Sequence, residues 1–129
     1  MAAMLPISFG EALERTEEAL KQEGFGIISQ IDIQNALKTK IGVDYRPYTI
    51  LGACNPQLAY EALQIEDKVG TMLPCNVVVQ ELGPQQTEVA AIDPVASMQA
   101  IENAELTKAA REARTRLCLL YTSPSPRDS

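Results

Sequence analysis

The sequence predicts one α+β domain, and three features indicate it. Short apolar segments alternate every second residue, as half-buried strands do. Segments with helical spacing lie between them, each with its own start and stop signals. The turn sequence Gly83-Pro84-Gln85-Gln86 joins two apolar segments as a β-hairpin. A chain of 129 residues is long enough to bury a single ordinary core.

The first elements are a short strand and a helix. Residues 4–9 are expected to form the strand. Ser8 and Glu11 form a capping box, in which the two side chains satisfy free amides at the helix start. The helix then carries an apolar stripe, and Gly24 caps its end; the stripe consists of Leu13, Thr16, Ala19 and Leu20.

A second strand and a second helix follow. Alternation predicts that Phe25, Ile27, Ser29 and Ile31 lie on one face of the strand. Asp32 is a favourable cap for a helix that ends at Gly42, with Ile33, Leu37 and Ile41 on one stripe.

The third strand leads directly into a third helix. Tyr48, Ile50, Gly52 and Cys54 form one face of this strand, and Thr49, Leu51 and Ala53 form the other. Asn55-Pro56 is a strong helix start, because Asn caps well and Pro at the first helical position loses no needed donor. The buried stripe is expected to contain Leu58, Ala59, Ala62 and Leu63.

The hairpin and a last helix complete the domain. Residues 76–82 and 87–93 are its strands, and Asp93-Pro94 ends the second one. The last helix begins at about Ala104. Its inward residues are predicted to be Leu106, Ala109, Ala110, Ala113 and Leu117, and its outward ones Arg111, Arg114 and Arg116.

Residues 118–129 differ from everything before them. The segment CLLYTSPSPRDS has no strand or helix period, and it matches the translation of a transposase-type sequencing adapter. We interpret it as a non-native, disordered tail and exclude it from the fold, as one would a fusion scar. The domain is therefore expected to span residues 1–117, with Cys118 outside it.

Composition excludes several classes of function. The net charge of −6 opposes binding to nucleic acid and to anionic membrane surfaces, which both require basic residues. The absence of histidine excludes Ser-His and Cys-His catalytic pairs and imidazole metal sites. The first ten residues do not form a secretory signal, and no apolar run is long enough to span a bilayer. We therefore expect a cytoplasmic protein with reduced thiols, no metal and no cofactor.

Cys54 is the first candidate for chemistry. It ends a strand directly before the Asn55-Pro56 helix start, where free amides and the helix dipole favour thiolate over thiol. The alternative is a small buried hydrophobic residue, as most free cysteines are. Cys75 gains interest only if the fold brings it near Cys54, because two thiols together can form a disulfide, bind a soft metal or transfer sulfur.

Two polar features offer weaker candidates. Arg46, between Tyr45 and Tyr48, is a candidate ligand for an anion, with a solvated strand entrance as the alternative. Asp93 before Pro94 is a candidate base, although Asp-Pro is mostly a turn signal. The glycines form no phosphate-binding loop.

The chain resembles the family called domain of unknown function 302. The resemblance rests on the blocks EEALKQEGFGIISQIDI, DYRPYTILGACNPQLAYEAL, GTMLPCNVVV and AIDPVASM. It implies an antiparallel sheet with helices on one side, similar to the TATA-binding-protein-like fold and often paired as a homodimer. It implies no established activity. The residues at its signature positions are Cys54, Asn55, Pro56, Pro74, Cys75 and Asn76.

These observations favour a non-enzymatic, homodimeric module that binds a small ligand or a partner. Its candidate site residues are Cys54, Asn55, Cys75, Asn76 and Arg46. A thiol-dependent redox, sulfur-handling or soft-metal-binding protein that uses Cys54, with or without Cys75, is the alternative. A third interpretation is purely structural, with both cysteines in the core.

Overall fold

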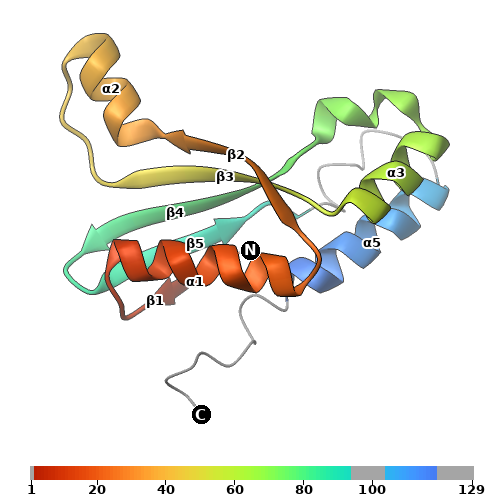
Figure 1. The fold of residues 1–129 in the computed structure, drawn as a ribbon, viewed down its shortest axis with the longest axis horizontal. Helices are drawn as coiled ribbons and strands as arrows, with labels where there is room; N and C mark the ends of the chain where they lie inside the picture. Colours follow the sequence, from red (N-terminus) through yellow and green to blue (C-terminus); the bar gives the residue numbers. More distant parts are fainter. Residues whose placement is uncertain (1, 94–103, 119–129) are drawn as a thin grey trace.

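A five-stranded antiparallel sheet forms the centre of the molecule (Figure 1). The computed structural model describes residues 2–93 and 104–118. The strands are β1 (Ala2–Leu5), β2 (Gly26–Asp32), β3 (Tyr48–Cys54), β4 (Cys75–Gly83) and β5 (Gln86–Ala91), in the spatial order β1-β5-β4-β3-β2. The α+β fold predicted from the sequence is confirmed.

The helices lie between the strands along the chain. They are α1 (Phe9–Gln22), α2 (Ile33–Ile41), α3 (Pro56–Ile65) and α5 (Ala104–Cys118), with a 3₁₀ helix η1 (Asp67–Met72) after α3. Helix α1 contacts β2, β4 and β5. The core lies between α1 and the sheet, where Leu20, Phe25, Leu51 and Val77 have at most 2% of their surface exposed.

The first strand is shorter and earlier than predicted. It covers Ala2–Leu5 rather than residues 4–9, and it pairs with β5. The predicted cap is present, because Ser8 Oγ accepts a hydrogen bond from the Glu11 N–H at 3.3 Å. Since Ser8 caps α1, Phe9 belongs to the helix and not to the strand.

A bulge in β2 overturns the predicted face of this strand. The register with β3 shifts between Ile27 and Ser29, so that Ile28 is the extra residue. Phe25 and Ile27 pack against the core, whereas Ser29 and Ile31 lie with Gly52 and Ile50 on the opposite face. Strict alternation fails here because one unpaired residue inverts every later side chain.

The third strand has the two faces that the sequence predicts. Thr49, Leu51 and Ala53 are buried towards the core. Tyr48 and Ile50 are only half-buried on the other face. They pair with Gln80 and Val78 of β4, and the hairpin from β4 to β5 turns at Pro84 and Gln85.

Helices α3 and α5 pack against each other at one end of the sheet (Figure 1). Small residues allow a close approach, since Ala62 and Ala110 join Val69 of η1 in one buried cluster. Leu63 is 42% exposed, so its predicted place in the buried stripe is wrong. Ala110, Ala113 and Leu117 are buried as predicted, while the Leu106 side chain lies outside the described residues.

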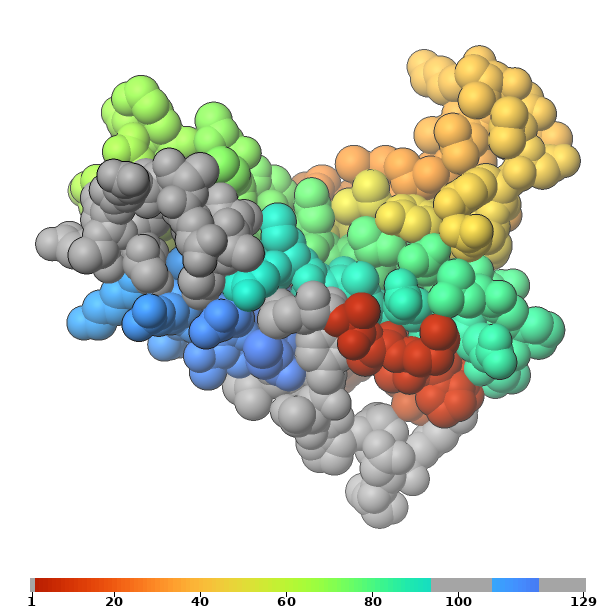
Figure 2. Space-filling view, turned by 180° about the vertical axis from the view of Figure 1, so that it is seen from behind, coloured from red at the N-terminus to blue at the C-terminus, as the bar shows by residue number. Residues whose placement is uncertain are grey.

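Helix α2 projects from the opposite end of the sheet (Figures 1 and 2). Both of its ends are capped as predicted: Asp32 Oδ1 accepts from the Asn35 N–H at 2.9 Å, and Gly42 adopts φ +69°. No residue of α2 is buried, and Ile41 of its apolar stripe is 66% exposed. The helix is therefore regular in geometry but does not share the core.

Candidate functional site

Cys54 and Cys75 meet at the ends of two neighbouring strands. Ala53 of β3 pairs with Cys75 of β4, which places the two cysteines one position out of register. Both line a small apolar cavity of about 30 Å³ between the strand ends, α3 and α5. Leu58, Ala62 and Ala110 are among the residues that form the rest of its wall. A space of this size exceeds what one water molecule requires.

Burial keeps both thiols protonated. It raises the pKa of Cys54 above the ordinary value for a thiol. It also raises the pKa of Cys75, which reaches about 11 with a further contribution from the charge that Cys54 would carry. The predicted preference of Cys54 for the thiolate form is therefore wrong.

The helix start itself explains why it does not activate Cys54. Pro56 has no N–H to offer. The Leu58 N–H donates to Asn55 Oδ1 at 3.1 Å, so the cap already uses this donor. The desolvation of the sulfur then dominates, because burial disfavours the charged form.

The two asparagines have different surroundings. Asn55 is 6% exposed and lines the cavity while it caps α3. Asn76 is exposed and pairs with Gly52 on the neighbouring strand, and its carbonyl accepts from the Ile92 N–H at 3.2 Å. The structure thus gathers Cys54, Asn55 and Cys75 around one cavity and leaves Asn76 beside it.

Arg46 lies at the other end of β3. Its Nη1 donates to the Tyr45 hydroxyl at 2.7 Å and to Gln80 Oε1 at 3.2 Å, and its guanidinium stacks over the Tyr45 ring at 4.7 Å. Gln80 Nε2 in turn donates to Glu88 Oε1 at 3.0 Å. Arg46 is therefore part of an exposed network of its own and does not join the cysteines.

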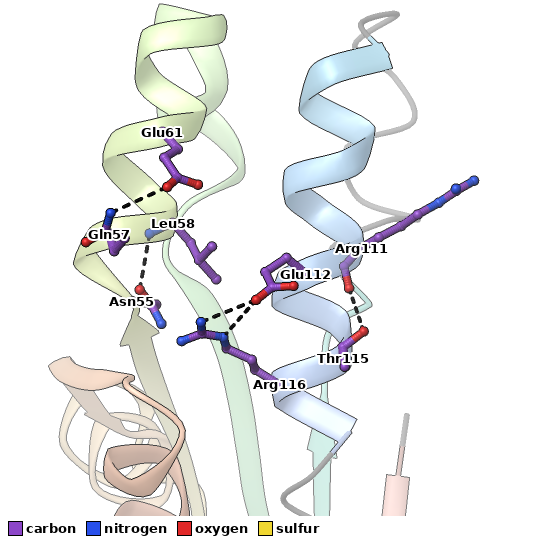
Figure 3. A network of polar contacts seen from close by, with 8 residues as sticks. All are labelled: Asn55, Gln57, Leu58, Glu61, Arg111, Glu112, Thr115 and Arg116. Carbon is purple, nitrogen blue, oxygen red and sulfur yellow. Dashed lines mark hydrogen bonds and ion pairs between the residues drawn. The ribbon is translucent and has the colours of Figure 1, made fainter.

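A groove between α3 and α5 is the feature that sequence reasoning missed (Figure 3). Its volume is about 1110 Å³, and Leu58 and Ala109 line both this groove and the small cavity. Its charged residues are Glu61 from α3 and Lys108, Glu112 and Arg116 from α5. The groove is thus lined by side chains of both charges together with apolar residues such as Leu58, Ile65 and Ala109.

Arg116 faces this groove rather than solvent alone. Its Nη2 lies 3.3 Å from Glu112 Oε1, and its side chain is 39% exposed. Arg111 and Arg116 belong to the same helix but point in different directions (Figure 3). The helical spacing predicts that Arg116 lies outward; only the packing of α3 beside α5 shows that it borders a groove.

The acidic and sulfur side chains of the described residues are the ones that could group around an ion. Within residues 2–93 and 108–118, no group of three or more cysteine, aspartate or glutamate side chains is arranged to hold an ion. Asp93 Oδ2 lies 3.5 Å from Arg114 Nη1 in an ion pair. Among the described helices, none is long and apolar enough to cross a membrane.

The fold, the small cavity and the neighbouring groove define a small α+β domain with a cysteine-lined pocket. The family model described as Domain of unknown function DUF302 matches residues 1–120, and the chain belongs to this family. The matched region ends three residues beyond Leu117 and α5 ends at Cys118, while residues 119–129 lie outside the described part of the chain.

A solved structure agrees with this assignment. An uncharacterized conserved DUF302 protein from Bacillus stearothermophilus is 32% identical to the chain, and the similarity covers 93% of each chain. The two structures superpose with a TM-score of 0.85. No curated protein matches the sequence.

Proposed function

We propose that this protein is a partner-binding module whose first partner is a second copy of itself. The observation that supports the proposal is α2, a helix capped at both ends and without a buried residue. Isolated helices of nine residues are marginal in water, so a helix of this length depends on packing for most of its stability. We infer that α2 packs against a second copy of the chain.

Exposed apolar residues are concentrated in the same segment. We call residues 28–46 the arm. Of the ten large hydrophobic residues with exposed side chains in the described chain, five belong to it: Ile28, Ile31, Ile41, Val43 and Tyr45. Figure 2 shows that the part of the arm that contains α2 projects from the body, whereas residues 28–32 belong to β2. Exposed large apolar side chains that gather in one segment favour a protein interaction site there.

Charge also favours a second copy as the occupant. The arm contains three basic and two acidic residues, although the whole chain carries −6. Helix α1 contains Glu11, Glu14, Glu17 and Glu18 and only two basic residues. A slightly basic arm and an acidic body attract each other between copies, which guides their association.

The molar mass in solution tests this proposal. Size-exclusion chromatography with light scattering is expected to give twice the chain mass of 14.1 kDa. Ile41→Lys is expected to shift the protein to the monomer, because it places a charge in the apolar contact. Leu63→Lys on α3 is a matched control at an exposed leucine outside the arm. A wild-type monomer at all concentrations would refute the proposal.

Thiol chemistry at the cavity is a second candidate function. It is favoured by one observation, the convergence of Cys54 and Cys75 on the same cavity. The raised pKa of both thiols opposes it, because the thiolate is the reactive form. Alkylation of the folded protein followed by mass spectrometry separates the candidates. If neither cysteine reacts and no metal or persulfide is carried by the purified protein, this second function is excluded.

A further inference from the structure

An apolar row crosses the face of the sheet that lies away from the core. Register partners in a sheet lie on the same face, so the strand pairings define this row. It consists of Ala2, Ala90, Val78, Ile50 and Ile31, one residue from each of the five strands. The next residues along the strands, Thr49 and Val79 among them, are buried in the core, so the apolar row faces the other way. Figure 2 shows β4 and β5 from this side with no described helix in front of them.

The residues that flank this row carry almost no charge. They are Met4, Glu88, Gln80 and Tyr48 on one side and Asn76, Gly52 and Ser29 on the other. We call these residues and the apolar row the open face. Glu88 is its only charged residue, although 22% of the chain is charged. Depletion of charge is typical of the centre of an interface between subunits, so the open face has the composition of a contact surface.

The arm and the open face form one continuous surface. Ile31 belongs to both, and 47% of its side chain is exposed. At the other end of the arm, Arg46 Nη1 donates to Gln80 Oε1 of the open face at 3.2 Å, and the ring centroid of Tyr45 lies 6.1 Å from that of Tyr48. A partner that covers the arm therefore meets the open face as well.

Helix α2 alone offers too little area for a stable dimer. Its nine residues present a side of roughly 14 by 10 Å, whereas stable interfaces bury about 800 Å² on each partner. The open face comprises three rows of alternate residues across five strands, which corresponds to roughly 24 by 20 Å. The open face therefore supplies most of the area that α2 lacks.

We propose that α2 of each copy packs on the apolar row of the other copy in a reciprocal dimer. This inference rests on the proposed self-association and adds the surface that receives the arm. The apolar stripe Ile33, Leu37 and Ile41 recurs every fourth residue and extends over about 12 Å. The apolar row extends over about 19 Å, because neighbouring strands lie about 4.8 Å apart, so the stripe fits within it. A twofold axis forms the same contact twice.

Charge agrees with this arrangement. The basic residues of α2 are Lys38 and Lys40 in its last turn, and α2 has no acidic residue in its first turn. Lys38 is already paired with Asp44 of its own chain at 2.8 Å. The single charge of the open face is the carboxylate of Glu88, so Lys40 of the other copy has an oppositely charged residue within the same contact.

Isotope-filtered nuclear Overhauser spectroscopy tests where the arm lies. In a mixture of carbon-13-labelled and unlabelled wild-type protein, the filtered spectrum contains only contacts between copies. We expect cross-peaks from the methyl groups of Leu37 and Ile41 to those of Val78 and Ala90. If the molar mass is that of a dimer but these cross-peaks are absent, or two open faces contact each other instead, the inference is wrong while the proposed self-association stands. A monomer at all concentrations would refute both.

Substitutions on the open face and outside the arm provide a second test. Val78→Lys is expected to weaken dimerisation about a hundredfold or more, because it places an unpaired charge in the contact. Leu63→Lys introduces the same charge on α3 and is expected to dimerise like the wild type. If Val78→Lys does not fold, Met4→Lys replaces it, since this side chain is 52% exposed; a loss of about tenfold is expected at this edge position. A folded variant of the open face that dimerises as tightly as the wild type would overturn the proposal.

Discussion

Gly52 shows how a single residue fixes the centre of the sheet. It lies in β3, buried between β2 and β4. A Cβ at this position would collide with Ser29 Oγ and would lie 3.0 Å from Pro74 Cγ. The bulge at Ile28 is what brings Ser29 opposite Gly52, so the strand irregularity and the glycine depend on each other.

The first prediction concerns this contact. Gly52→Ala is expected to lower the free energy of unfolding by about 1–3 kcal/mol, since overpacking a close-packed site forces its neighbours to move. Chemical denaturation measures the loss. The double variant Gly52→Ala with Ser29→Ala should recover part of it, because the hydroxyl is the nearest obstacle. An unchanged single variant would show that the site has more room than the structure gives.

The second prediction concerns the Cys75 thiol and its pH dependence. Its pKa is raised from 9.0 to about 11 in the folded protein, so the folded state holds its proton more tightly than the unfolded state does. The contribution of the protonated Cys75 thiol to the free energy of unfolding is therefore fully present below pH 9. It is lost as the pH rises from 9 towards 11, because the unfolded chain releases this proton first. Two pKa units correspond to on the order of 2–3 kcal/mol.

Denaturation curves at pH 8 and at pH 11 test this expectation for Cys75. The wild type should lose more stability than Cys75→Ala over this interval, because the variant has no thiol to deprotonate. Taking the difference between the two proteins removes the titration of lysines and tyrosines that both contain. Parallel losses in the two proteins would contradict the raised pKa.

At the scale of elements, capping signals predicted the helices well. Ser8, Asp32 and Asn55 each cap a helix as expected, because a cap is a local hydrogen bond within four residues. The pattern failed at Ile28 and at Leu63. The bulge in β2 depends on its pairing with β3, and the side of α3 that is buried depends on where α5 packs. Both neighbours are distant in the sequence, so local alternation carries no information about the bulge or the buried side.

The candidate site could be predicted only in part for the same reason. The motif around Cys54 and Asn55 is local and visible in the sequence. That Cys75 joins the same cavity and that Arg116 faces Asn55 follows from strand register and helix packing. The sequence shows the helix start after Cys54 but not the burial of its sulfur, and the burial is what raises the pKa of this thiol.

The third prediction removes an element. Replacement of residues 34–47 by Asn-Gly joins β2 to β3 through a two-residue hairpin turn. The register permits this, because Asp32 pairs with Thr49 and residues 33 and 48 then come to lie opposite each other on either side of the turn. No residue of α2 is buried, so we expect the shortened chain to fold with its core unchanged. Circular dichroism and the dispersion of amide signals measure this. Failure to fold would show that the arm contributes to the core of its own chain.

At the scale of the whole molecule, the two ends of the sheet have different roles in these proposals. The end with α3 and α5 contains the cavity and the groove, with the buried cysteine and small residues of the core nearby. The other end carries the arm, with exposed apolar side chains and a capped helix. In these proposals the body supplies most of the stability, whereas α2, which has no buried residue, gains its packing from a partner.

The last prediction follows from this division. If two copies associate through their arms, a higher protein concentration stabilises the folded dimer by mass action. A hundredfold increase in concentration is worth roughly 2.7 kcal/mol per dimer, which raises the midpoint of thermal unfolding by a few degrees. Scanning calorimetry across such a range measures the shift. Ile41→Lys should abolish it, while Leu63→Lys should retain it. If the midpoint of thermal unfolding of the wild type does not change with protein concentration, then association of two copies does not stabilise the folded chain, and the prediction is wrong.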